Sequence, residues 1–257
     1  MLVETLRPEE GVAVVRLNNP PLNLVTRELT RQLEQALVAI ASDTAIRAVV
    51  VTGAGDRAFC AGSDIREFGE VRENVIAAKL QRENAVWTQL EDLPQPTVAA
   101  IHAPALGGGF ELALCCDLRV LEDGARVGLP EIRLGVIPGT GGPLRLTRLV
   151  GEARAKALIY FGDTIAAEEA RALGLVNHVV PHGRTQEAVL GLARRLAAQP
   201  AQAVQAAKRS VRAASEMGRA AALEHALRLS EHVFRTEDML EGVAAFLEKR
   251  PPEFRHR

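Results

Sequence analysis

The fold of this chain is decided by the stretch APALGGGFELALCCDLRVLEDGARVGLPEIRLGVIPGTGG, residues 103 to 142. Three consecutive glycines, Gly107 to Gly109, lead directly into an apolar segment with helical spacing that begins at Phe110. The first turn of a helix carries free N–H groups and a partial positive charge, and glycine lets a ligand approach that backbone closely. This pattern predicts a backbone site for a negatively charged oxygen.

Two carboxylates accompany the glycines. Glu111 lies one residue inside the apolar segment, where an anion is costly to bury, and Glu131 follows in the loop GLPEIRLG. A backbone anion site with carboxylates beside it suits the stabilisation and protonation of an enolate. The alternatives are that Glu111 is only a helix-terminal carboxylate that favours the dipole and that Glu131 is a solvated loop residue. The apolar surroundings of Glu111 and the second glutamate downstream favour a catalytic role for both.

The overall composition is that of an ordinary globular enzyme. The 257 residues are 47% hydrophobic and 25% charged, with a formal net charge of −1, which argues against nucleic acid as an obligatory partner. The chain begins without a secretion signal pattern and has no run of 18 apolar residues, so we expect a cytoplasmic protein with no membrane partner. The spacing of Cys60, Cys115 and Cys116 suits neither a zinc site nor a disulfide framework, which predicts buried, reduced thiols.

Strands and helices alternate over the first two thirds of the chain, which predicts an α/β core. Thr26 is expected to cap a helix, and a single long helix is expected over residues 72–93, ended by Pro94. Beyond Pro181 every segment reads as helical and alanine-rich. We therefore divide the chain into an α/β body, 1–183, and a helical region, 184–257, whose apolar faces suit packing on a neighbouring subunit.

Five motifs follow one another along the chain: AFCAGSDI (58–65), AAIHAPALGGGFELALCCDLRV (99–120), GLPEIRLGVIPGTGG (128–142), ARALGLVNHVVP (170–181) and FLEKRPPEF (246–254). In this order they resemble the motifs of the crotonase (enoyl-CoA hydratase/isomerase) superfamily. The resemblance implies an α/β fold in which a crotonase-like spiral of ββα turns carries the acyl-CoA site and a C-terminal α-helical region oligomerises. It implies a homotrimer, or a hexamer made of two trimers; periodicity alone does not predict the spiral.

The resemblance also assigns the site. Members of the family stabilise a thioester enolate with two backbone N–H groups, which correspond here to those of Ser63 and Gly108. Glu111 and Glu131 match the two glutamates of the family's hydratases. Gly139 matches a position whose N–H orients the second glutamate, although a simple turn glycine explains it nearly as well. Coenzyme A is part of the substrate, and no metal or other cofactor is expected.

Further positions match substrate contacts of the family. Ala61 and Ile65 resemble residues whose carbonyls hold the adenine of coenzyme A, and Arg66 stands where many relatives carry a lysine near its phosphates. A solvated arginine is an equal alternative, and Asp64 is expected to hold its own loop through backbone hydrogen bonds. The remaining matches are Phe68 and Trp87 at the acyl pocket, where either also suits plain core, and Phe246 and Lys249, which reach the coenzyme A of a neighbouring subunit.

The activity implied by this resemblance is hydration of a trans-2-enoyl-CoA to the 3-hydroxyacyl-CoA. In it Glu111 activates the water and Glu131 handles the proton at Cα. One alternative is Δ3,Δ2-enoyl-CoA isomerisation on the same scaffold, which needs a single base. Another, from a different class, is a non-catalytic or RNA-binding relative, which the near-neutral charge and the two glutamates disfavour.

Overall fold

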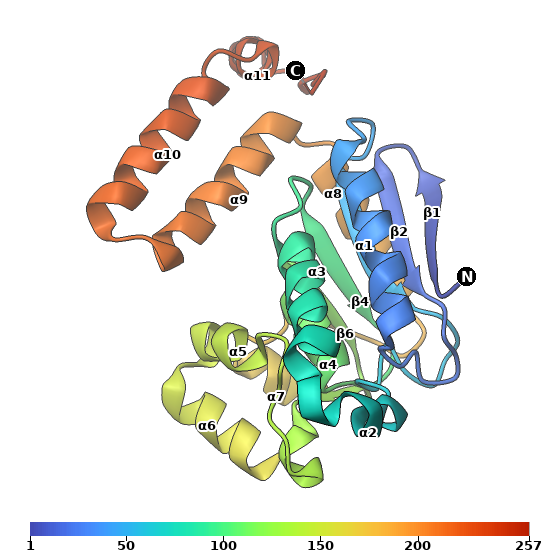
Figure 1. The fold of residues 1–257 in the computed structure, drawn as a ribbon. Helices are drawn as coiled ribbons and strands as arrows, with labels where there is room; N and C mark the ends of the chain where they lie inside the picture. Colours follow the sequence, from blue (N-terminus) through green and yellow to red (C-terminus); the bar gives the residue numbers. More distant parts are fainter. Residues whose placement is uncertain (257) are drawn as a thin grey trace.

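A computed structural model describes residues 1 to 256 and contains two β-sheets with helices packed around them (Figure 1). The larger sheet has six strands in the order β1-β2-β3-β4-β6-β9. β1 pairs antiparallel with β2, and each of the other neighbouring pairs is parallel. These strands span β1 Val3–Glu9, β2 Val12–Leu17, β3 Ala48–Gly53, β4 Thr97–Ile101, β6 Leu118–Glu122 and β9 His178–Val180.

The smaller sheet has three short strands in the order β5-β7-β8, namely β5 Ala105–Leu106, β7 Arg126–Gly128 and β8 Thr164–Ala166. Twice in succession the chain runs from a strand of the first sheet to a strand of the second and then to an α-helix: β4-β5-α4, followed by β6-β7-α5, with the 3-10 turn Pro130–Leu134 between β7 and α5. This repeated strand–strand–helix turn is the ββα arrangement expected from the resemblance. The α/β fold with a C-terminal helical region is thereby confirmed.

Side chains of the parallel strands point alternately to the two faces of the large sheet. Val49 and Val51 of β3 belong to the main hydrophobic cluster on the side of α1 and α3, whereas Val50 packs on the other face with Val189 of α8. Because helices cover both faces, the central strand β3 reads AVVVTG without polar alternation.

The helices begin and end mostly where their sequence signals predict. The Thr26 hydroxyl accepts a hydrogen bond of 3.1 Å from the Leu29 N–H, so the predicted cap of α1 is confirmed. The α-helices span α1 Arg27–Ser42, α2 Phe68–Val71, α3 Gln81–Glu91, α4 Gly108–Leu114, α5 Gly142–Val150, α6 Glu152–Phe161, α7 Ala167–Ala172, α8 Thr185–Ala197, α9 Ala201–Glu216, α10 Arg219–Val233 and α11 Glu237–Glu248.

The single long helix predicted over residues 72–93 is wrong. This segment instead contains a 3-10 turn at Arg72–Asn74 and a π-helical turn at Ile76–Leu80 before α3 begins. In the π turn the buried Lys79 ammonium lies 2.7 Å from Glu67 Oε2 and 2.9 Å from Glu83 Oε1. The ion cluster thus connects the π turn to residues of two other turns. Hydrophobic periodicity along the sequence does not predict such a turn.

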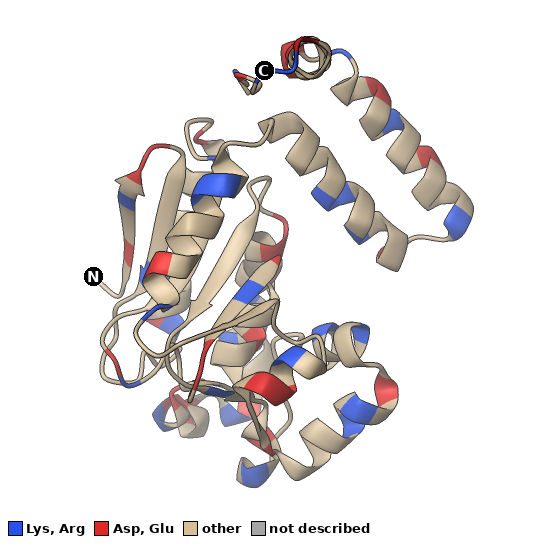
Figure 2. Cartoon of the chain, turned by 180° about the vertical axis from the view of Figure 1, so that it is seen from behind, with Lys and Arg blue, Asp and Glu red and all other residues tan. Residues whose placement is uncertain are grey.

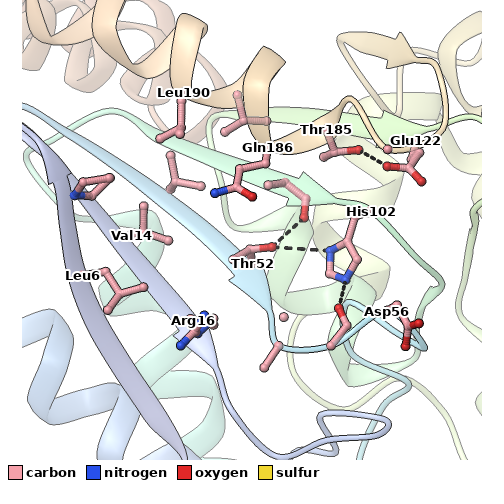
Figure 3. Close-up of a pocket in the computed structure, with 18 of the residues that line it drawn as sticks. Leu6, Val14, Arg16, Thr52, Asp56, His102, Glu122, Thr185, Gln186 and Leu190 are labelled. Carbon is pink, nitrogen blue, oxygen red and sulfur yellow. Dashed lines mark hydrogen bonds between the residues drawn. The ribbon is translucent and has the colours of Figure 1, made fainter.

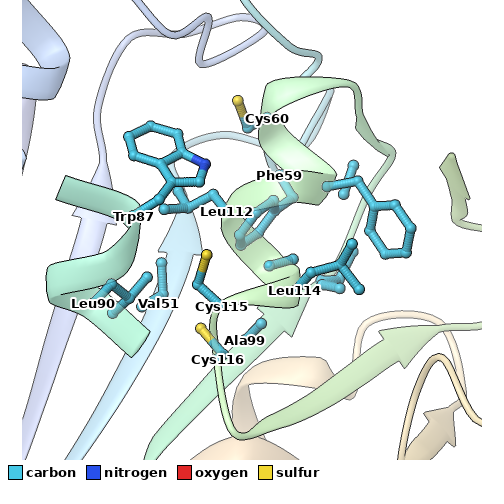
Figure 4. Packing of buried hydrophobic residues seen from close by; sticks show 14 of the residues in the cluster. Val51, Phe59, Cys60, Trp87, Leu90, Ala99, Leu112, Leu114, Cys115 and Cys116 are labelled. Atoms are coloured by element: carbon cyan, nitrogen blue, oxygen red, sulfur yellow. The ribbon is translucent and has the colours of Figure 1, made fainter. Parts of the chain in front are cut away.

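The hydrophobic interior beneath α4 contains all three thiols, as predicted. Figure 4 shows Cys60, Cys115 and Cys116 among buried apolar side chains that include Trp87 and Leu112. All three are free cysteines, and burial raises the pKa of Cys60 and of Cys116 to about 12. They therefore act as small apolar residues of the core.

The helices beyond residue 183 fall into two groups. α8 covers the large sheet, whereas α9, α10 and α11 extend away from it, with α10 lying alongside α9 (Figure 1). Lys208 of α9 connects them to the body, because its Nζ lies 2.8 Å from Asp117 Oδ2. The division of the chain at residue 183 into two domains stays a prediction.

Charge is distributed evenly over the molecule. Figure 2 shows Lys and Arg residues interspersed with Asp and Glu on both the body and the C-terminal helices. Within residues 1–256, no helix is long and apolar enough to cross a membrane, and no group of three or more His, Cys, Asp or Glu side chains is arranged to hold a metal ion.

Candidate functional site

Glu111 lies in the first turn of α4, and residues of the motif PGTGG (138–142) hold its side chain. Its side chain is buried, and its Oε1 accepts hydrogen bonds from the N–H groups of Thr140, at 2.9 Å, and Gly142, at 2.7 Å. Its Oε2 accepts a third from the Thr140 hydroxyl. Burial raises the pKa of Glu111, and these three hydrogen bonds oppose that rise. The carboxylate is therefore fixed in position and solvated by the protein backbone.

Glu131 lies in the 3-10 turn Pro130–Leu134 and is bound quite differently. Both of its carboxylate oxygens are buried, and neither has a hydrogen-bond partner among residues 1–256. Burial, with a further contribution from the negative charge of Glu111, raises the pKa of Glu131 to about 7. A carboxyl group that titrates near neutral pH and has no protein partner is equipped to exchange a proton with a ligand.

The glycine loop brings Glu131 close to the start of α4. A Cβ atom placed on Gly107 would lie only 3.1 Å from Glu131 Oε1, and one placed on Gly109 would lie 2.2 Å from the Cys60 carbonyl oxygen. The second distance admits no side chain, so glycine is required where α4 approaches the 58–65 loop. The loop, α4 and Glu131 therefore form one site.

The two predicted anion-binding amides also come together. A Cβ atom on Gly108 would lie 3.7 Å from the Ser63 backbone nitrogen, and one on Gly62 would lie 3.8 Å from the Gly108 nitrogen. The hydrogen-bond network of residues 1–256 uses neither the Ser63 N–H nor the Gly108 N–H, the latter being the first of α4. Two free N–H groups that lie close together can both donate hydrogen bonds to one negatively charged oxygen.

Asp64 holds its own loop, as predicted. Its carboxylate caps a 3-10 turn by accepting from the Arg66 N–H, and the Arg66 guanidinium binds both of its oxygens. The Arg66 side chain is otherwise exposed, so it is available at the surface beside the loop. Ile65 is also exposed, and Phe68 at the start of α2 is half-buried. The structure thus places these residues next to Ser63, and their contacts with a substrate stay predictions.

Trp87 of α3 is fully buried in the main hydrophobic cluster (Figure 4). Its indole Nε1 has no hydrogen-bond partner among the described residues. Burial of this kind fits the alternative that Trp87 is a residue of the hydrophobic core. A role for Trp87 at the acyl pocket stays a prediction. Ala61 is half-buried, with its N–H donating 2.9 Å to the Leu22 carbonyl.

The Gly139 N–H makes no hydrogen bond to Glu131 in this structure, since both Glu131 oxygens lack a partner among residues 1–256. Its expected role in orienting Glu131 stays a prediction, beside the alternative of a simple turn glycine. The next amide, that of Thr140, is the one that binds a catalytic candidate, and it binds Glu111. Sequence analysis missed the roles of Thr140 and Gly142. The motif PGTGG was a visible signal, but only folding shows which of its amides point at a carboxylate.

Phe246 and Lys249 lie at the opposite end of the molecule from Glu111. Phe246 of α11 is 83% exposed, and Figure 1 shows α11 far from α4. A single chain does not bring these two residues to its own site. Their expected contact with a neighbouring subunit's substrate stays a prediction.

A separate cavity of about 470 Å³ lies on the other face of the large sheet, between that sheet and α8. Figure 3 shows it with His102, whose Nε2 is 3.0 Å from the Gly55 carbonyl oxygen, and with Thr185, whose hydroxyl donates 2.6 Å to Glu122. None of the four predicted catalytic positions lines it. The candidate site described above is therefore distinct from this cavity.

Comparison with known proteins agrees with this geometry. The model of the enoyl-CoA hydratase/isomerase family matches residues 7–257, and the chain belongs to this family of enzymes. The chain is 41% identical to a probable enoyl-CoA hydratase of Rhizobium meliloti over 258 residues, covering 100% of this chain and 98% of that protein. It is 39% identical to the 2,3-dehydroadipyl-CoA hydratase of Escherichia coli over 250 residues, covering 97% of both chains. The crystal structure of an enoyl-CoA hydratase from Bacillus anthracis superposes with a TM-score of 0.96 at 36% identity, covering 100% of both chains.

Proposed function

We propose that this enzyme hydrates trans-2-enoyl-CoA thioesters to 3-hydroxyacyl-CoA. The observation that carries the proposal is the pairing of two buried carboxylates in different environments beside two free backbone amides. Glu111 is held by three hydrogen bonds, and Glu131 is held by none. The names of the relatives, which are hydratases of enoyl-CoA substrates, support the same activity.

The amides of Ser63 and Gly108 would bind the thioester carbonyl oxygen. When water adds to Cβ, electron density moves through the conjugated system to that oxygen, and two fixed N–H donors stabilise the enolate that forms. Their proximity supports this role, since a Cβ atom placed on Gly108 would lie 3.7 Å from the Ser63 nitrogen and one placed on Gly62 would lie 3.8 Å from the Gly108 nitrogen. Conjugation with the thioester already makes Cβ electrophilic, so the proposed reaction uses no metal or other cofactor.

The two carboxyl groups would divide the proton transfers. Glu111 accepts a proton from the water whose oxygen bonds to Cβ, and Glu131 in its acid form gives a proton to Cα of the enolate. The pKa of Glu131, about 7, leaves a substantial fraction of this group protonated near neutral pH, as a general acid requires. A net transfer of the proton from Glu111 to Glu131 then restores the site.

We further propose that the chain assembles as a homotrimer, or as a hexamer of two trimers. Within one chain, α10 buries none of its residues. The C-terminal helices expose the large apolar side chains Val211, Leu223, Leu227, Phe234, Leu240, Val243, Phe246 and Leu247. An apolar surface of this extent is typical of a subunit interface. In such an assembly Phe246 and Lys249 would reach the acyl-CoA of a neighbouring subunit.

The proposed activity is tested by following the loss of the conjugated-thioester absorbance of crotonyl-CoA. A 3-enoyl-CoA substrate is assayed in parallel with the same preparation. Hydration of crotonyl-CoA or of a longer 2-enoyl-CoA supports the proposal. Conversion of the 3-enoyl substrate without hydration of any 2-enoyl-CoA would instead establish the isomerase.

A further inference from the structure

The peptide group that joins Gly139 to Thr140 is held on both of its edges. Its N–H, on Thr140, donates 2.9 Å to Glu111 Oε1. Its carbonyl oxygen, on Gly139, accepts 2.8 Å from Nδ2 of Asn84. In a trans peptide the N–H and C=O point in opposite directions within one rigid plane. The orientation of a donor to Glu111 is therefore coupled to the side chain of Asn84.

Asn84 is well placed to hold that plane. It lies in the first turn of α3, and its Nδ2 also donates 2.9 Å to the Leu80 carbonyl, so each of its two amide hydrogens has an acceptor. The π turn that directly precedes α3 also packs closely on the loop, because a Cβ atom on Gly139 would lie 2.9 Å from Leu80 Cδ2. The loop is thus in direct contact with both the π turn and α3 at this point.

The following carbonyl is anchored to the same helix. Arg145 Nη1 donates 2.9 Å to the Thr140 carbonyl oxygen, and Arg145 Nε and Nη2 donate to Glu91 Oε2 at 2.9 and 2.6 Å. Glu91 is the last residue of α3. Two successive carbonyls of the loop that binds Glu111 are therefore fixed by α3, one directly through Asn84 and one through Arg145.

We propose that Asn84 is a positioning residue for hydration: its side-chain amide orients the Gly139–Thr140 peptide so that the Thr140 N–H remains on Glu111. The proposal rests on the catalytic role proposed above for Glu111. Asn84 touches no reacting atom in this scheme and acts only through the carboxylate. Its contribution should therefore depend on the presence of Glu111.

Loss of the Asn84 hydrogen bond to the Gly139 carbonyl should change the protonation of Glu111. Burial raises the pKa of Glu111, and the hydrogen bond from the Thr140 N–H is one of those that oppose the rise. A weakened bond would raise the pKa further and move the acid limb of the rate profile to higher pH. The charged groups that interact with Glu111 are Glu83 of α3, Glu131, and Arg145 of α5, and the substitutions below change none of them.

The test compares Asn84→Ala and the isosteric Asn84→Asp, which lacks the amide donor, with wild type. Gln81→Ala, at an exposed position of the same helix, is the matched control. For crotonyl-CoA we expect both Asn84 variants to lower kcat by about 3- to 10-fold while KM changes by less than about 2-fold. In Asn84→Ala the acid limb of kcat/KM shifts to higher pH, and Gln81→Ala retains the wild-type profile.

A second comparison separates positioning from general structural damage. In a Glu111→Gln background, Asn84→Ala should add little or no further loss of kcat, because its effect passes through Glu111. Equal losses in both backgrounds, an unchanged pH profile, or unfolding of both Asn84 variants would overturn the inference. The proposed role of Glu111 fails by a different result, namely wild-type rates of hydration by Glu111→Gln itself. The proposed function fails by a third, namely no hydration of any 2-enoyl-CoA by the wild-type enzyme.

Discussion

Glu131 leaves both carboxylate oxygens without a hydrogen-bond partner among residues 1–256, whereas Glu111, whose charge helps raise the pKa of Glu131, has both oxygens bonded to Thr140 and Gly142. Two carboxyl groups in one site thus have opposite surroundings. Such a difference separates an acid from a base when both must act at one pH.

The raised pKa of Glu131 makes the stability of the protein depend on pH. The pKa rises from 4.5 to about 7 on folding, so the stabilising effect is present below 4.5 and is lost as pH rises through about 7. Glutamine does not titrate. We therefore expect Tm of Glu131→Gln, relative to wild type, to increase between about pH 5 and pH 8. Glu73→Gln, at an exposed carboxyl, is the control; a difference in Tm that stays constant for Glu131→Gln would contradict the raised pKa.

Removal of either carboxylate should nearly abolish hydration. A positioned general acid or base contributes on the order of 10²–10⁴ in rate, so Glu111→Gln and Glu131→Gln should each lower crotonyl-CoA hydration by at least about 10²-fold. Because both groups serve the same addition of one water molecule, the double variant should lose much less than the product of the two single losses. Steady-state kinetics measures this. Fully multiplicative losses would show that the two glutamates act independently.

Gly108→Pro removes the N–H at the start of α4, which is one of the two free amides of the site. The loss of a single donor of this kind costs about 10²–10³ in kcat. Circular dichroism and thermal melting establish whether the variant is folded, and the hydration assay then measures turnover. A folded Gly108→Pro protein with near wild-type turnover would show that the oxyanion site lies elsewhere.

The exposed apolar side chains of α9, α10 and α11 predict a homo-oligomer. A charged residue placed among these side chains should weaken it. Leu227 on α10 is 71% exposed in the single chain, and Leu227→Asp would place a carboxylate in the proposed interface. Sedimentation velocity should show wild type as a trimer or hexamer and the variant shifted toward monomer. Val38→Asp, at an exposed apolar residue of α1, should leave the assembly intact. A stable wild-type monomer at micromolar concentration would contradict both the interface and the inter-subunit role of Phe246.

Local sequence was sufficient for much of the fold. The Thr26 cap, the apolar strand β3 and the helices beyond Pro181 follow from short-range rules of capping, β-branched content and helical periodicity, and the structure contains each of them. These features depend on neighbours within a few residues. In place of the single helix predicted over residues 72–93 the structure has a 3-10 turn, a π turn and α3. The π turn contains Lys79, whose partner Glu67 is 12 residues away in the sequence, and helical periodicity does not report contacts of this kind.

In the candidate site, too, some features follow from local sequence and others only from contacts between distant residues. Its glycines and its two glutamates were recognisable because their residue types and order are unusual in themselves, and both glutamates are brought together with the glycine loop. The amide that holds Glu111 could not be identified in this way. Of the amides in the motif PGTGG, those of Thr140 and Gly142 donate to Glu111. The sequence does not show this, because the direction of an N–H depends on the plane of its peptide.

The sequence by itself thus determined which residues are able to do the chemistry, because acidity, backbone freedom and helix-terminal amides are properties of residues and short segments. Only the tertiary structure decided how those residues differ from one another. Glu111 and Glu131 are the same side chain, and their environments diverge because one meets the amides of Thr140 and Gly142 while the other is buried without a partner. Hydrogen bonding and desolvation are set by atoms that lie far apart in the chain, and these two effects fix the charge that a carboxyl group carries.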